Sequence, residues 1–186
     1  MEVLKLSIGG PLLITPSKFF DGRGFVSETY SARDLEPHIG NVSFVQDNHS
    51  LSGDIGTVRG LHYQIPPCTQ GKLVRVVSGC AYDVAVDIRR GSPTFGRHVG
   101  VELTATNGSQ LWIPGGFAHG FCTLEENTEV VYKLTEYFSP AHERGIAWND
   151  PVVGIQWPVV SEEAVVSTKD MAQPLLADVP GYFSFP

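Results

Sequence analysis

The sequence predicts an all-β fold, a sandwich or barrel of short strands, and two observations support this prediction. Polar and apolar residues alternate with a period of two in short runs along most of the chain, as in strands whose two faces meet different surroundings. Turn-forming residues separate the runs, for example Asp21-Gly22 and Asn107-Gly108. Short strands separated in this way favour a sandwich or barrel over β-α-β units.

The expected strands, in chain order, cover residues 12–15, 25–30, 42–48, 57–64, 72–78, 81–88, 98–103, 110–113, 120–124 and 128–138. Two short peripheral helices are expected as well. One covers residues 31–39, where Ser31 would cap the N-terminus with Asp34 at the capping-box position, and the other begins near Ser167. From Ala141 onward the alternation is lost and Pro and Gly become frequent, so we expect this last part to wrap over the sheets.

Length and composition limit the class of protein. The 186 residues fit a single domain, residues 1–186, that can form a core without disulfides or metals. Apolar residues make up 42% and charged residues 18%, which excludes a disordered or low-complexity chain. The net charge of −7 argues against a general nucleic-acid surface. Three cysteines without CxxC spacing favour a reducing compartment, and no signal-peptide or membrane-spanning pattern is seen, so we expect a cytoplasmic protein that binds no membrane.

The rest of the chain is organised around residues 57–79, which read as a strand, a Pro-containing loop and a second strand. In the second strand Lys72 shares a face with Val74 and Val76. If this face is the core, the ammonium group enters an apolar interior, which is costly unless the protein uses the charge. His62 lies on a similarly placed face of the first strand, so a histidine and a lysine are expected to meet inside the β-structure.

Arg59 and His62 should face opposite sides of a regular strand, because their spacing is odd. Gly60 between them suggests a bulge that re-aims one of the two side chains. The alternative is that the two residues serve different sites.

His62 has the most suitable intrinsic pKa for a general base near neutral pH. Such a base is usually oriented by a carboxylate, and the sequence leaves Asp83 and Asp170 as alternatives. Tyr132 shares a strand face with Val130 and is a candidate proton donor, but the residues alone favour a core tyrosine with a satisfied hydroxyl group.

Other side chains indicate an anionic ligand with an aromatic part. Arg23 lies in a flexible Asp-Gly-Arg-Gly turn, where it either binds a ligand or is simply solvated. Phosphate oxygens would accept charge-assisted hydrogen bonds from Arg23, Arg59 and Lys169, together with Gln46 and Asn48. Tyr137 and Phe138 are placed to stack on a base or sugar, with edge packing as the alternative.

Residues 114–121, PGGFAHGF, have the Pro-x-Gly-x-x-His spacing of the second motif of the cupins, which would bring His119 to the mouth of a small barrel. In metal-binding cupins the first motif offers His-x-His and then a glutamate, but here Gln64 and Lys72 take two of these positions. A lysine ammonium beside a divalent cation is unfavourable. We therefore expect an organic acid–base pocket without a metal or cofactor.

Nine segments spanning nearly the whole chain carry a more specific resemblance. They are DGRGFVSETY (21–30), SFVQDNHS (43–50), VRGLHYQ (58–64), GKLVRVVSG (71–79), YDVAVDIRRGSPTFG (82–96), LWIPGGFAHGF (111–121), VVYKLTEYFSP (130–140), GIAWNDP (145–151) and IQWP (155–158). In this order they resemble the dTDP-4-dehydrorhamnose 3,5-epimerases, a deoxysugar-epimerase branch of the cupins.

The resemblance implies a double-sheet jelly roll that forms a homodimer, with strands contributed across the interface. It implies epimerisation at C3 and C5 of dTDP-4-dehydro-6-deoxy-D-glucose, giving dTDP-4-dehydro-L-rhamnose without metal or cofactor. His62 would be the base oriented by Asp170, Tyr132 the acid, and Lys72 the group near the C4 carbonyl oxygen. Substrate-contacting positions would be His119, Arg23, Glu28, Gln46, Asn48, Arg59, Phe138, Glu143 and Lys169. Phe138 stands where the family often has tyrosine.

Two alternatives remain open at this point. A mono-epimerase that inverts only C3 or C5 of another dTDP-deoxysugar would carry the same motifs. A non-catalytic cupin that binds a nucleotide sugar is disfavoured, because a binding module has no need of His62 and Tyr132 together as base and acid.

Overall fold

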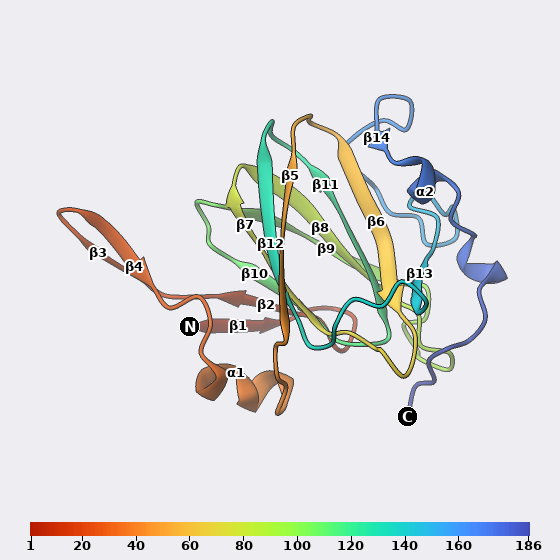
Figure 1. The fold of residues 1–186 in the computed structure, drawn as a ribbon, viewed down its shortest axis with the longest axis horizontal. Helices are drawn as coiled ribbons and strands as arrows, with labels where there is room; N and C mark the ends of the chain where they lie inside the picture. Colours follow the sequence, from red (N-terminus) through yellow and green to blue (C-terminus); the bar gives the residue numbers. More distant parts are fainter.

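The computed structural model describes all residues, Met1–Pro186, and its strands form two facing sheets and one separate hairpin (Figure 1). The first sheet contains, in spatial order, β1 (Glu2–Lys5), β2 (Leu12–Thr15), β10 (Gln110–Ile113), β7 (Lys72–Ser78), β12 (Thr128–Leu134) and β5 (Gln46–Ser52). The second contains β13 (Glu143–Gly145), β6 (Thr57–Gln64), β11 (Phe117–Thr123), β8 (Cys80–Asp87) and β9 (His98–Thr104), and β14 (Val165–Val166) pairs with β6. The predicted double-sheet jelly roll is confirmed.

The core lies between the two sheets, because each sheet turns one apolar face toward the other. The main cluster takes Val74, Val76, Leu111 and Val130 from the first sheet and Ala81, Ala85, Val99, Leu103 and Phe121 from the second. The outer face of the second sheet is also buried, since Val84 and Val86 pack against Ile146, Val153, Leu176 and Val179. The C-terminal part therefore wraps over the second sheet, as the sequence predicts.

None of the helices has both the length and the apolar character that a membrane-spanning helix requires.

A hairpin of β3 (Lys18–Asp21) and β4 (Gly24–Ser27) projects away from both sheets (Figure 1). Its two strands pair only with each other. The sequence indicated one strand over residues 25–30, which is too long at its C-terminal end. The hairpin exposes large apolar side chains, with Phe20 at 75% and Val26 at 71% relative accessibility.

The helices lie at the periphery. In α1 (Ala32–Ile39) the residue at the N-cap is Ser31, but its side chain makes no capping hydrogen bond, so the predicted capping box is wrong. The backbone carbonyl of Ser31 accepts the first helical bonds instead. In α2 (Thr168–Met171) the hydroxyl of Ser167 accepts from the backbone N–H of Asp170 at 3.1 Å, so this cap holds. A single 3-10 turn, η1 (Leu176–Asp178), follows.

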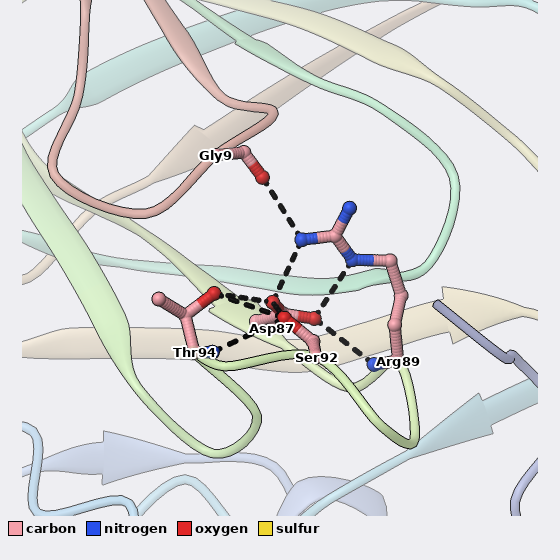
Figure 2. A network of polar contacts seen from close by, with 5 residues as sticks. All are labelled: Gly9, Asp87, Arg89, Ser92 and Thr94. Atoms are coloured by element: carbon pink, nitrogen blue, oxygen red, sulfur yellow. Dashed lines mark hydrogen bonds and ion pairs between the residues drawn. The ribbon is translucent and has the colours of Figure 1, made fainter. Parts of the chain in front are cut away.

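A polar network secures the loop between β8 and β9 (Figure 2). The carboxylate of Asp87, fully buried, accepts hydrogen bonds from Ser92, from Thr94 and from two guanidinium nitrogens of Arg89 at 2.6 to 2.9 Å. Arg89 also donates to the carbonyl of Gly9 at 2.9 Å. Burial alone would raise the pKa of Asp87, but the hydrogen bonds from Arg89, Ser92 and Thr94 hold the pKa below its ordinary value.

Candidate active site

A cleft opens between the two sheets at the end marked by β5, β6 and β12. Two cavities of about 470 and 370 Å³ meet there, and both are lined by His62, Lys72 and Tyr132. His62 comes from the second sheet, whereas Lys72 and Tyr132 come from the first. The three residues that the sequence singled out for chemistry therefore share one cleft and occupy two opposing walls.

Gly60 changes the direction of side chains along β6. On β11 the partner of His62 is His119 and the partner of Arg59 is Phe121, so β6 contains one extra residue across this interval. Gly60 has a φ of +128°, and a Cβ there would lie 2.5 Å from the Cα of Gly120, so only glycine fits. As a result Arg59 and His62 line the same cavity, and the bulge interpretation is correct.

Asp170 orients His62. Its Oδ1 lies 2.6 Å from Nε2 of His62, and its Oδ2 accepts from the backbone N–H of Gly60 at 3.3 Å. Burial raises the pKa of Asp170, but the hydrogen bond and charge of His62 and the bonds from Gly60 and Ser167 outweigh it and lower the pKa. An ionised carboxylate only accepts hydrogen bonds, so Nε2 of His62 carries its hydrogen and Nδ1 is left as the basic nitrogen.

Asp83 forms a second, more deeply buried pair with His119. Both carboxylate oxygens of Asp83 lie 3.0 Å from Nε2 of His119, and the aspartate is fully buried. Burial lowers the pKa of His119, Asp83 opposes the shift, and the charges of Lys72 and His62 add to it, so the imidazole is neutral near pH 7. The choice that the sequence left open is thereby resolved geometrically: Asp83 pairs with His119 and Asp170 with His62.

Lys72 is a buried cation near both pairs. Its Nζ donates to the backbone carbonyl of His62 at 3.2 Å. Burial lowers the pKa of Lys72 to about 8, while the negative charges of Asp83 and Glu143 oppose the shift. The ammonium group therefore remains mostly charged at neutral pH inside a poorly solvated cleft, where its field acts with little screening.

Tyr132 lies on the wall opposite His62. In the sheet it pairs with Asn48 of β5 on one side and Val74 of β7 on the other. Its phenol oxygen accepts a hydrogen bond from Nδ2 of Asn48 at 3.3 Å, and its ring packs against the main core cluster. Tyr132 also lines both cavities, so its side chain is shared between the core and the cleft.

Several predicted binding residues surround this centre. Arg59 is fixed by bonds from Nε to the hydroxyl of Ser52 at 3.0 Å and from Nη2 to the carbonyl of Leu51 at 3.1 Å. Lys169 forms an ion pair with Glu143 at 2.5 Å, and these two residues line the first and second cavity respectively. The cleft wall is completed by Gln46, Asn48 and Phe138.

Arg23 and Glu28 lie outside the cleft of their own chain. Both are exposed, and Arg23 is paired with Asp21 at the turn of the projecting hairpin. Neither residue lines either cavity.

Gln64 has a structural role that the sequence did not indicate. Its buried amide donates to the carbonyls of Cys68 and Tyr137 at 2.7 and 3.1 Å and accepts from the N–H of Ser139 at 2.6 Å. It thereby joins the loop after β6 to the loop after β12. The one signal in the sequence was that Gln64 takes a ligand position of the metal-binding cupins.

No group of three or more histidine, cysteine, aspartate or glutamate side chains is arranged to hold a metal ion.

A jelly roll with an oriented base and a phenol on facing walls of its central cleft defines an acid–base enzyme of the cupin class. A family model described as dTDP-4-dehydrorhamnose 3,5-epimerase matches residues 5–178, and the chain belongs to this family of isomerases. The resemblance seen in the sequence is confirmed.

Relatives agree over the full length. A dTDP-4-dehydrorhamnose 3,5-epimerase of Sinorhizobium fredii is 50% identical over 185 residues, covering 100% of this chain and 94% of the relative. A Legionella pneumophila 3,5-epimerase, solved in complex with dTDP-4-keto-L-rhamnose, superposes with a TM-score of 0.94 at 43% identity, covering 100% and 98% of the two chains. A 3'-monoepimerase of Streptomyces bikiniensis, in complex with dTDP-quinovose, gives 0.87 at 32% identity, covering 94% and 87%.

Proposed function

We propose that this protein inverts C3 and C5 of dTDP-4-dehydro-6-deoxy-D-glucose to give dTDP-4-dehydro-L-rhamnose, in the biosynthesis of dTDP-L-rhamnose. The observation that carries the proposal is the placement of His62 and Tyr132 on opposite walls of one cleft that also contains Lys72. The inversion of a carbon requires one group to remove a proton from one face and another to supply a proton to the opposite face. A single group would return the proton to the face it left.

The C4 ketone makes the hydrogens on C3 and C5 acidic, because removal of either gives an enolate delocalised onto the carbonyl oxygen. Nδ1 of His62 takes the proton, and Asp170 stabilises the imidazolium that forms. The ammonium group of Lys72 stabilises the negative oxygen in a cleft where charge is weakly screened. Tyr132 then protonates the same carbon from the other side, and the cycle repeats at the second carbon.

The nucleoside diphosphate gives the enzyme binding energy with which to position the sugar. Arg59 and Lys169, with the amides of Gln46 and Asn48, suit phosphate oxygens and sugar hydroxyls. Phe138, with 49% of its surface exposed at the cleft, suits stacking on a ring. A phenylalanine retains this stacking but lacks the hydroxyl group of the tyrosine common in the family.

The proposal includes a homodimer. The projecting hairpin presents Phe19, Phe20 and Val26 to solvent, which is expected of a surface covered by another chain. We infer that the hairpin packs on a second copy and brings Arg23 and Glu28 to the cleft of that copy. A cytoplasmic location is also proposed, supported by three cysteines that are all unpaired.

A mono-epimerase is the second candidate, supported by the likeness to the Streptomyces bikiniensis enzyme. The same experiment tests both. The protein is incubated with dTDP-4-dehydro-6-deoxy-D-glucose in D₂O, and NMR follows deuterium and configuration at C3 and C5. Deuterium and inversion at both carbons are expected. Inversion at one carbon would replace the proposal by the mono-epimerase, and a bound substrate without exchange would leave only a binding protein.

A further inference from the structure

A directed series of hydrogen bonds runs along the wall of the cleft and ends on the phenol of Tyr132. The backbone N–H of Phe138 donates to Oε1 of Gln46 at 2.9 Å. Nε2 of Gln46 donates to Oδ1 of Asn48 at 2.8 Å, and Nδ2 of Asn48 donates to the Tyr132 oxygen at 3.3 Å. All four residues line the same 370 Å³ cavity, so the series lies beside the reacting groups.

The direction of each bond follows from the first donor. A backbone N–H can only donate, so the atom of Gln46 that faces Phe138 must be the amide oxygen. The nitrogen of Gln46 then faces Asn48, which must present its own oxygen there and its nitrogen to the phenol. The assignment of both amides is therefore fixed by a group that has no alternative orientation.

The Tyr132 oxygen thus receives a hydrogen bond on the side of Asn48, and the hydrogen of the phenol must point elsewhere. With Tyr132 on the wall opposite His62, the direction left to this hydrogen is the cleft. The same N–H of Asn48 faces the oxygen after the proton has left, where it donates to a phenolate. A bond to a charged oxygen is stronger than one to a neutral hydroxyl, so the donor favours the transfer.

We propose that Asn48 is a positioning residue that makes Tyr132 a proton donor, and that Gln46 sets its orientation. This inference rests on the proposed epimerisation. In the step concerned, the enolate carbon forms a bond to the phenol hydrogen, the O–H bond breaks, and the C4 carbonyl is restored. The phenolate then takes a proton from solvent, while the imidazolium of His62 loses one to solvent, so no other reactant is needed.

Two isosteric changes test the inference by altering hydrogen-bond polarity with little change in shape. In Asn48→Asp a carboxylate oxygen faces the phenol, which then donates its hydrogen to residue 48 and not to the cleft. In Gln46→Glu, one carboxylate oxygen still accepts from the N–H of Phe138, and the other accepts from Nδ2 of Asn48. The amide of Asn48 must then be rotated, so that its oxygen faces the phenol. The second variant leaves Asn48 and Tyr132 unchanged in sequence.

The measurement compares two initial rates in D₂O: entry of deuterium into recovered substrate and formation of inverted product. His62 alone accounts for the first rate. Its imidazolium exchanges the abstracted proton for deuterium from the solvent and then returns the deuteron to the face of the sugar from which the proton was taken. Both variants should raise the ratio of exchange to inversion by about tenfold or more, since one general acid typically contributes about 10²–10⁴-fold. Tyr132→Phe provides the reference for a missing acid.

Asp47→Asn is the matched control, a carboxyl–amide exchange on the adjacent residue of β5. Asp47 does not line the 370 Å³ cavity and pairs with Lys133. The ratio of exchange to inversion in Asp47→Asn should therefore equal that of the unaltered protein. Thermal unfolding checks that each variant is folded, and Gln46→Glu decides the question if Asn48→Asp does not fold.

A raised KM with an unchanged ratio in both variants would overturn the inference, because it would indicate substrate contact alone. An equal fall in both rates would also overturn it, since a structural defect affects both. These outcomes presuppose turnover by the unaltered protein; its failure to form product would instead reject the proposed function.

Discussion

Lys72 and His62 are joined across the two sheets, because the ammonium group on β7 donates to the backbone carbonyl of His62 on β6 at 3.2 Å. The bond fixes the cation relative to the strand that carries the base. The group that stabilises the negative oxygen is thereby held against the backbone of the residue that removes the proton. The charge of this buried lysine determines the pH dependence that we expect of the reaction.

Activity should fall as pH rises through about 8, because burial lowers the pKa of Lys72 to about 8 and only its protonated form stabilises the enolate. In a profile of kcat/KM from pH 6 to 10, Lys72→Arg should move this fall beyond the measured range, since arginine keeps its charge. Lys72→Met should lower kcat strongly while nucleotide binding is retained. An unchanged basic limb in the arginine variant would assign the fall to another group.

Asp170→Asn should lower kcat by at least about 10²-fold, because the amide no longer fixes the His62 tautomer or stabilises the imidazolium. Substrate affinity, measured by calorimetry with dTDP, should change little. Asp178→Asn is the control, a similar change at an exposed residue of η1. Comparable losses in the two variants would contradict the orienting role.

Mixing two inactive variants tests the dimer and the role of the hairpin together. If Arg23 serves the partner's cleft, Arg23→Ala and His62→Ala should complement each other when the chains are co-expressed. Random pairing gives heterodimers as half of the dimers, each with one intact site of two, so about a quarter of full activity is expected. His62→Ala mixed with Asp170→Asn should show no recovery, since both defects lie in one cleft. Absence of complementation with a normal dimer would place Arg23 outside the partner's site.

Asp87→Asn should lower the free energy of unfolding by about 3–5 kcal/mol at pH 7, because it leaves Arg89 without its buried counter-charge. The folded-state pKa of Asp87 lies below its unfolded value. Its contribution is therefore present above about pH 4 and lost as pH falls through the folded pKa. Urea unfolding should show that the difference in the free energy of unfolding between the variant and the parent protein becomes smaller at low pH. The control Asp54→Asn, at an exposed residue, should show no such difference at any pH.

Much of the fold could be predicted from alternation, since β6, β7 and β10 have the bounds that the sequence indicated. The errors occur where hydrogen bonds or packing with distant side chains, not periodicity, decide the backbone. The expected strand 128–138 ends at Leu134, because the amide of Gln64 holds Tyr137 and Ser139 in a loop. The strand expected over 42–48 starts at Gln46, and residues 42–45 instead pack Phe44 onto the small cluster around Leu35.

The candidate site was predictable in its strand residues and not in its long-range partners. His62 and Lys72 follow from parity and from the cost of burying charge, whereas the role of Tyr132 came from the family resemblance and not from its strand pattern. The pairing of His62 with Asp170 connects residues 108 positions apart, and no local pattern distinguishes Asp170 from Asp83. In the projecting hairpin, β4 was predicted in part by the strand expected over residues 25–30, but β3 was missed. β3 is short and exposes both of its phenylalanines, so it lacks the alternation of a strand on a core.

The extra residue at Gly60 divides β6 into two lengths with opposite phase. On either side of it, residues 57–59 and 61–64 alternate in opposite register, so Arg59 and His62 reach the same cavity from one strand. A Cβ at position 60 would lie 2.5 Å from the Cα of Gly120, so any side chain there would push β6 away from β11. Exchange of this one glycine would therefore displace the arginine and the histidine together, although neither residue is itself changed.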